Sequence, residues 1–197
     1  MYFVFDSKLS SYRNSYIQAK LLLSASSDTL APNVYMKWRD AKPMIPIEKP
    51  LPFFRFEVRK NVVHPDNYWT GSSRDLYSGK LLALLKQVEV RYETFDTEIY
   101  ESKSNVRVLE DYRVFRLMNT FSLIDPDQVE ITDNFIIKKM AVRESLEQKP
   151  PAMFRDENYR QVVFVSSDLR EQMESQGITG CLFRTLEQFV ARDVSDF

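Results

Sequence analysis

The sequence predicts an α+β fold, with two sheet-bearing subdomains and a few short helices. Residues Phe54–Val58 alternate between apolar and charged side chains, which is typical of a strand with one buried and one solvated face. The run Gln161–Val165 is mainly apolar and β-branched, which is typical of a buried strand. Leu169 and Met173 then lie four residues apart among charged residues, a spacing that predicts a short amphipathic helix. Strands and short helices mixed in this way indicate the α+β class.

The residues around that helix predict its two ends and the strand that follows it. The side-chain oxygens of Ser166, Ser167 and Asp168 can accept hydrogen bonds from the free N–H groups of a first helical turn. Gly177 ends the helix, because glycine adopts the left-handed conformation without a steric penalty from a Cβ atom. Ile178–Leu186 is predicted as a second strand. The stretch therefore forms one unit of strand, cap, helix, glycine and strand.

A similar unit is predicted earlier in the chain. Ser72–Leu76 resembles Ser166–Leu169 with one insertion. Val88–Glu93 alternates between apolar and charged residues and predicts a strand with one solvated face. Between these two stretches, four leucines supply the apolar face of a helix: Leu81, Leu82, Leu84 and Leu85. The two stretches indicate a duplicated helix–strand unit, and a coincidence of short patterns is the other interpretation.

The remaining elements are predicted from short apolar runs and turn residues. Polarity and charge peak at Ser102–Asn105, which predicts an N-terminal subdomain of residues 1–104 and a C-terminal subdomain of residues 105–197. One continuous domain is the alternative. Short helices are expected at Tyr16–Leu23 and Ala141–Gln148. Further strands are expected at Tyr2–Phe5, Val34–Trp38, Val106–Leu109 and Tyr112–Leu123, with a hairpin in 129–142 around Asp133-Asn134.

The charge balance argues against partners that need a strongly charged surface. The chain has 27 basic and 28 acidic residues and a net charge of -1, so neither nucleic acid nor a charged membrane surface is predicted as a partner. Basic residues are in excess before residue 70 and acidic residues after it. This asymmetry predicts either attraction between the two parts or a basic partner for the acidic part.

Cysteine usage and hydropathy predict a cytoplasmic location. The single cysteine, Cys181, rules out an internal disulfide and indicates a reducing compartment. It lies in an apolar stretch and is interpreted as an inert buried thiol. No apolar run approaches the roughly 20 residues that are needed to span a bilayer, and the first residues lack the features of a signal peptide.

The sequence predicts a protein that is not an enzyme and needs no cofactor. Only one histidine, His64, is available for a catalytic pair, and its His64-Pro65-Asp66 tripeptide is interpreted as a plain turn rather than a co-chaperone motif. The four glycines form no phosphate-binding loop. No metal site is predicted, because Asp125 and Asp127 lack a suitably spaced third ligand. A carboxylate-based hydrolase is the alternative for an enzyme.

One cluster of acidic residues is the candidate partner-binding surface. It consists of Glu93, Asp96, Glu98 and Glu101, flanked by Tyr92 and Tyr100. An acidic surface of this kind speeds association with a basic partner and makes it more selective. A solvated strand edge or loop is the other interpretation of the same charges.

Three features, in their order along the chain, carry a resemblance to a known family. The chain opens with an apolar strand at Tyr2–Phe5, a central segment has Tyr112, Asn119 and Asp125, and Val163–Phe183 follows a strand, Ser-x-x-Leu helix, Gly-hydrophobic-x-Gly, hydrophobic-x-Phe pattern. In these features the chain resembles a bacterial immunity-protein family of polymorphic toxin systems, immunity family eleven. The long polar segment Ser7–Asn33 departs from the family pattern.

The resemblance implies a function by protein binding. Such a protein binds a cognate secreted antibacterial toxin domain and neutralises it by direct contact in the bacterial cytoplasm. The expected partner is therefore a protein, with neither nucleic acid nor membrane involved. A non-catalytic adaptor or structural module of a larger assembly is the alternative.

Overall fold

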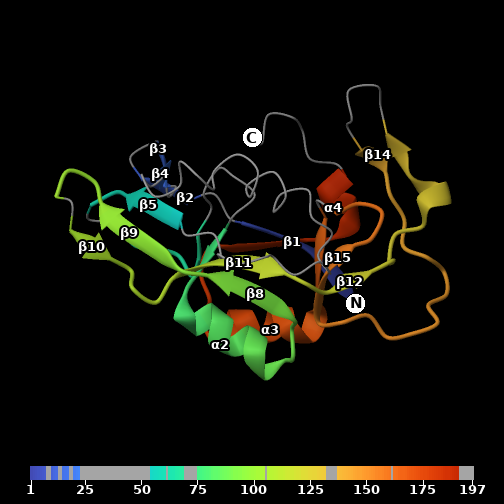
Figure 1. Cartoon of the computed structure of the whole chain (residues 1–197). Coiled ribbons are helices and arrows are strands. Elements are labelled where there is room, and N and C mark those ends of the chain that lie inside the picture. Colours follow the sequence, from blue (N-terminus) through green and yellow to red (C-terminus); the bar gives the residue numbers. More distant parts are fainter. Residues whose placement is uncertain are drawn as a thin grey trace, which may run out of the picture.

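The structure is a computed structural model, shown in Figure 1, whose element labels are used below. It describes residues 1–7, 54–60, 62–68, 75–104, 106–131, 137–160 and 162–190, and the backbone of three short strands at 10–12, 15–17 and 20–22. These residues contain several small sheets and three α-helices. The predicted α+β class is therefore confirmed.

The first sheet joins the two ends of the described chain. Its strands, in spatial order, are β12 (Thr120–Phe121), β15 (Met153–Asp156), β16 (Val163–Ser166), β1 (Tyr2–Ser7) and β17 (Cys181–Arg184). Strand β1 lies between β16 and β17 and is antiparallel to both. The strands predicted at the first residues and on either side of the C-terminal helix are confirmed, with shorter bounds.

Two four-stranded sheets hold the middle of the chain. One has the order β6 (Asn67–Tyr68), β7 (Leu76–Tyr77), β11 (Arg113–Leu117) and β8 (Tyr92–Phe95). The other has the order β10 (Arg107–Val108), β9 (Thr97–Glu101), β5 (Phe54–Val58) and β4 (Lys20–Leu22). The other described strands form two hairpins. One pairs β2 (Ser10–Tyr12) with β3 (Ser15–Ile17), and the other pairs β13 (Glu130–Ile131) with β14 (Ile137–Lys139). A 3₁₀ turn, η2 (Pro126–Gln128), precedes β13.

The helix–strand unit occurs twice with the same topology. Helix α3 (Ser167–Ser175) connects β16 to β17, and β1 lies antiparallel between those two strands. Helix α2 (Gly79–Gln87) connects β7 to β8, and β11 lies antiparallel between them. Both helices have nine residues and lie on the same side of the sheets (Figure 1). A duplicated unit is therefore present as a repeated arrangement of elements, but the residues that suggested it do not correspond, because Leu76 lies on β7 and the serine that caps α2 is Ser78.

The two helices also begin and end alike. The hydroxyl of Ser78 accepts a hydrogen bond from the Leu81 N–H at 3.2 Å, and the hydroxyl of Ser166 does the same for Leu169 at 3.2 Å. At the other end, Glu89 has a φ of 56° and Gly177 a φ of 64°. In each helix the next N–H bonds back five residues, from Val90 to Leu85 O and from Ile178 to Met173 O.

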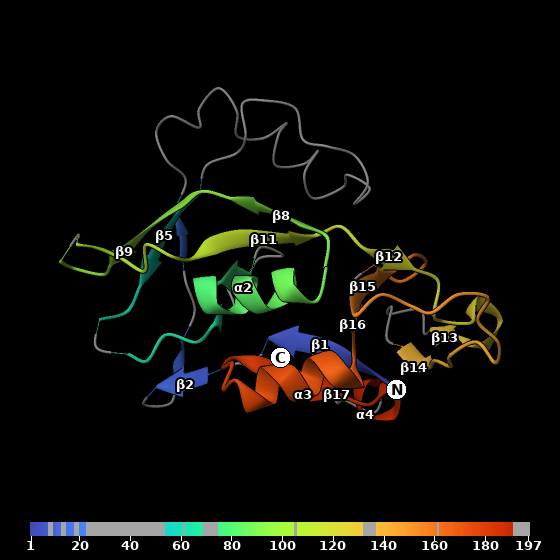
Figure 2. The same ribbon diagram turned by 90° about the horizontal axis from the view of Figure 1, so that it is seen from below.

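One apolar core is shared by the two units. It contains Leu81, Leu84 and Leu85 of α2, Leu169 and Met173 of α3, and residues of β1, β7, β11 and β16. The rings of Tyr77 and Phe115 stack near its centre, with their centroids 4.1 Å apart. A second cluster lies under β5 and β9, and a third lies beneath helix α4 (Leu186–Val190), where Phe189 is buried. Figure 2 shows α2 beside β11 and α3 beside β1.

Three predicted elements are wrong. Val88–Glu93 is not a strand from its start, because Val88 and Glu89 end α2 and β8 begins only at Tyr92. Val90 is buried by the turn that closes the helix, so its apolar character reflects helix termination and not a pleat. The helix at Tyr16–Leu23 is replaced by β3 and β4, and that at Ala141–Gln148 by irregular backbone. The predicted strand Val34–Trp38 lies outside the described residues.

The pairing of strands crosses the predicted subdomain boundary at residue 104. Strand β1 pairs with β16 and β17, and β11 pairs with β7 and β8. Strands β9 and β10 pair directly across the boundary. None of the helices that the structure describes is long and apolar enough to cross a membrane.

Candidate functional site

The outer face of the β10-β9-β5-β4 sheet carries two of the six predicted partner-binding residues, Glu98 and Tyr100. Along β9, Thr97 and Ile99 are buried, so the alternation of a strand places Glu98 and Tyr100 on the opposite face. The register puts Arg55 beside Glu98, and Glu57 beside Tyr100, whose other neighbour is Arg107 of β10. This outer face is therefore a row of charged side chains around one tyrosine.

Arg55, Glu98 and Tyr100 form a connected cluster on that face. An Arg55 nitrogen donates to Glu98 Oε2 at 2.8 Å, and the Tyr100 hydroxyl donates to the same oxygen at 3.0 Å. The Arg55 guanidinium also lies 5.1 Å from the centre of the Tyr100 ring. The hydrogen bond from Arg55, followed by that from Tyr100, lowers the pKa of Glu98, and the same bond raises the pKa of Arg55. Both partners therefore stay charged at neutral pH.

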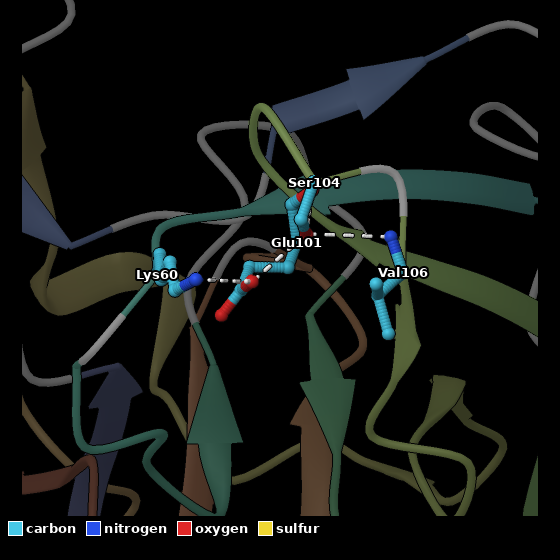
Figure 3. Close-up of polar contacts among 4 residues, drawn as sticks. All are labelled: Lys60, Glu101, Ser104 and Val106. Atoms are coloured by element: carbon cyan, nitrogen blue, oxygen red, sulfur yellow. Dashed lines mark hydrogen bonds and ion pairs between the residues drawn. The ribbon is translucent and has the colours of Figure 1, made fainter.

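Glu101 is held at the end of the same strand by the turn that follows it (Figure 3). Its Oε2 atom accepts a hydrogen bond from Ser104 Oγ at 2.8 Å and lies 3.8 Å from Lys60 Nζ. Ser104 Oγ in turn accepts from the Val106 N–H at 3.3 Å. The carboxylate is thus directed at its own turn and at the end of β5.

The remaining predicted residues lie on β8 and at its end. Glu93 forms an ion pair with the buried Arg116 at 2.8 Å, and Asp96 lies 3.4 Å from Arg113 Nε. The Tyr92 hydroxyl donates to Leu82 O at 3.2 Å, and its ring packs 5.4 Å from that of Phe115. Tyr92 and Glu93 therefore connect β8 to its neighbours.

All four predicted carboxylates pair with cations from other parts of the chain. The partners are Arg55, Lys60, Arg113 and Arg116, which lie on β5, just after β5, and on β11. The six predicted residues lie on β8, on β9 and at Asp96 between these strands, but the negative charge of the four carboxylates is largely compensated within the protein. The acidic docking surface stays a prediction, and this pairing weakens the electrostatic reason for it.

A basic hollow next to Glu101 was missed by the sequence reasoning. It has a volume of about 510 Å³ and is lined by Arg59, Lys60, Ser102, Lys103 and Ser104. The signal was present in the sequence, since Arg59-Lys60 follows the strand Phe54–Val58 and Lys103 lies in the predicted polar peak. Nothing in the sequence indicated that these two short basic stretches meet in space.

The structure also describes the residues that the sequence analysis considered as catalytic or metal-binding candidates. Burial lowers the pKa of His64, whose ring lies 5.7 Å from that of Tyr68. Burial raises the pKa of the Cys181 thiol to about 12, so it is protonated and a poor nucleophile at neutral pH. Asp125 accepts a hydrogen bond from the Asp127 N–H at 3.1 Å and thereby caps η2. Among the described residues, no group of three or more His, Cys, Asp or Glu side chains could hold a metal ion.

The residues that carry the family resemblance have contacts that stabilise the fold. The Tyr112 hydroxyl donates to Pro65 O at 3.1 Å, and the Asn119 side chain donates to Met153 O at 3.0 Å. Val163–Phe183 spans β16, α3 and most of β17. These positions are therefore informative about the fold and not about a partner. No model of a known protein family matches the chain, and no curated protein gives a significant match to it.

Proposed function

We propose that the protein is an immunity protein that binds a cognate toxin domain and neutralises it by direct contact. The contact surface is the outer face of the β10-β9-β5-β4 sheet, centred on Tyr100. The observation that supports this choice is the fixed position of Arg55 and Tyr100, which share Glu98 as a hydrogen-bond acceptor. Tyrosine and arginine are enriched among the residues that dominate protein interfaces.

Side chains that are already ordered favour binding. An interface loses roughly 0.5–1.5 kcal/mol for each flexible side chain that it immobilises. Arg55 is held by Glu98 and by the Tyr100 ring before any partner binds. Much of the conformational entropy of this side chain is therefore already lost on folding and is not lost again on binding. A stable complex would bury roughly 1,200–2,000 Å² in total. To reach that area, the adjoining turns would have to contact the partner together with this sheet face.

The neutralising role itself rests on the family resemblance. Inhibition by contact needs neither a cofactor nor a metal, and we place it in the cytoplasm, where the partner toxin would act. An adaptor would use the same kind of surface, and the test therefore has to separate binding from protection.

Co-expression rescue tests the proposal. A candidate cognate toxin domain is expressed with and without this protein, survivors are counted, and the two proteins are tested for co-purification. Survival with a stable complex is the expected result. A stable complex without survival would indicate an adaptor, and death without a complex from soluble protein would refute the proposal.

Substitutions in the complex locate the surface. Tyr100→Ala should weaken binding by at least tenfold, because truncating an aromatic hot-spot residue typically costs about 2 kcal/mol or more. Ile131→Ala is the matched control, since Ile131 is exposed on the β13–β14 hairpin at the other end of the molecule from β9 and β10 (Figure 1). Equal affinities of the two variants would exclude this face as the contact surface.

A further inference from the structure

We propose that the basic hollow at the end of β5 and β9 receives a carboxylate-bearing loop of a protein partner. The proposal rests on the proposed function and specifies the chemistry of the partner at that surface. It reverses the polarity that the sequence suggested, since the partner's contacting surface would be acidic and not basic.

The charges at this end of the sheet do not cancel. Residues 54–60 and 97–108 carry more cations than carboxylates: Arg55, Arg59, Lys60, Lys103 and Arg107 against Glu57, Glu98 and Glu101. Glu98 is bound to Arg55, and Glu101 lies near Lys60. Within the described part of the chain, Arg59, Lys103 and Arg107 are exposed and form no ion pair with a carboxylate.

The shape of the turn concentrates these unpaired charges. Arg59 and Lys103 both line the hollow, and Arg107 lies on the adjoining face as the neighbour of Tyr100. The charge of Arg107 contributes to lowering the pKa of Glu98, so its field extends over that face. The carboxylate of Glu101, beside the hollow, is directed at Lys60 and Ser104 (Figure 3). An incoming carboxylate would therefore meet Arg59, Lys103 and the hydroxyl of Ser102.

Lys103, which lines the hollow, lies at a strained backbone position. Lys103 has a φ of 72°, in the left-handed region that glycine and asparagine tolerate best. A lysine at such a position costs conformational energy that a glycine would not.

The interspersed carboxylates favour an acidic protein loop over a nucleic acid. Glu57 and Glu98 lie on the same sheet face as Arg55 and Arg107, and they would repel a continuous row of phosphates. A single acidic side chain or a short loop reaches the hollow without passing over them. The pattern thus fits a local carboxylate contact at the rim of a protein interface.

Association kinetics with the co-purified toxin domain test the proposal. Lys103→Gly removes one charge and relieves the strained φ, so it should bind more slowly without being less stable. Arg59→Glu should lower the association rate constant about tenfold at low salt, with the difference shrinking as salt screens the charges. Lys138→Glu is the control, because Lys138 is exposed on β14 and the substitution changes the net charge equally.

The outcomes separate this proposal from the proposed function. If cells are rescued but Arg59→Glu and Lys138→Glu associate at the same rate, the hollow is not a contact and the immunity function stands. If rescue fails, an octaglutamate peptide labelled with fluorescein serves as the probe. Salt-sensitive binding that Lys103→Gly weakens at least threefold supports the hollow as an acidic-peptide site with another partner. No binding of that peptide, or tighter binding of an eight-nucleotide single-stranded DNA, would overturn the proposal.

Discussion

At the scale of single residues, Asp66 connects the two helix–strand units. Its carboxylate accepts hydrogen bonds from Ser78 Oγ at 2.6 Å and from the N–H and hydroxyl of Thr179 at 2.9 and 3.0 Å. Ser78 caps α2, and Thr179 precedes β17. Burial raises the pKa of Asp66, but the hydrogen bonds from Ser78 and Thr179 outweigh burial and hold the pKa below its ordinary value. The turn that the sequence showed as His64-Pro65-Asp66 is thus a junction between the units.

Replacing this carboxylate should destabilise the whole fold. Asp66→Ala removes three hydrogen bonds and leaves their donors without a charged acceptor, so we expect the free energy of unfolding to fall by about 2–3 kcal/mol. Urea denaturation measures the free energy of unfolding. The control is Glu171→Ala, at an exposed site on α3, which should change this free energy by less than about 0.5 kcal/mol. Because the folded pKa is lowered, the contribution is present above the unfolded pKa and is lost as pH falls through the folded value. A stability difference that persists unchanged at the most acidic pH would contradict this account.

Asp75 should give stability the opposite pH dependence. Burial raises its pKa to about 7, against a hydrogen bond from Ser7 and the charge of Arg155, which lower it, while Asp6 raises it. Between the ordinary value of 3.8 and about 7, the folded state keeps a proton that the unfolded state has lost. Stability from this group therefore falls as pH rises through that window and is constant above it. Asp75→Asn should flatten this part of the pH profile, as measured by Tm from pH 4 to 8, and an unchanged slope would refute the assignment.

At the scale of elements, the two helices use the same terminal geometry with different residues. The left-handed position after α3 is Gly177, and the equivalent position after α2 is Glu89. Glu89→Gly should raise the free energy of unfolding by about 0.5–1 kcal/mol, because glycine adopts this conformation without a Cβ clash. Gly177→Ala should lower it by a similar amount for the converse reason. Thermal denaturation of both variants checks the pair, and a destabilised Glu89→Gly would show that the carboxylate itself matters there.

This pair also shows how far the sequence predicts the elements. The α3 unit is legible because a serine cap, a four-residue apolar spacing and a glycine all agree, which is typical of a locally encoded helix. The end of α2 was misread as a strand, because Glu89 carries no signal for a left-handed residue. The pairing of β1 between β16 and β17 could not be predicted, since it joins residues more than 150 positions apart and has no local pattern.

The strand placement of the acidic residues was partly predictable, and the compensation of their charge was not. The acidic residues between Glu93 and Glu101 lie on β8, on β9 and at the position between them, where the sequence predicted either a docking surface or a solvated strand edge or loop. Their cationic partners, among them Arg55 and Arg116, come from strands that only the folded chain places beside them. For the same reason the sequence alone could not show that Arg59 and Lys103 line the same basic hollow.

At the scale of the whole molecule, the two helix–strand units share an apolar core and several polar contacts. One core contains buried residues of both α2 and α3, and Lys80 Nζ of the first helix donates to Gly177 O after the second at 3.0 Å. The Asn67 N–H also bonds to Thr179 O at 3.0 Å, and a Cβ on Gly180 would lie only 2.7 Å from Pro65 Cβ. A unit that opened alone would expose half of a core and break these polar contacts.

We therefore expect α2 and α3 to unfold together. Native-state hydrogen exchange should give the most protected amides of the two helices the same free energy of opening, within about 0.5 kcal/mol, because both exchange only on global unfolding. Asp66→Ala should lower both values equally, whereas Glu171→Ala should leave both nearly unchanged. A lower opening energy for α3 alone, or an Asp66→Ala effect confined to one helix, would instead support two subdomains that open independently. In that case the shared core would be an interface between the two helix–strand units.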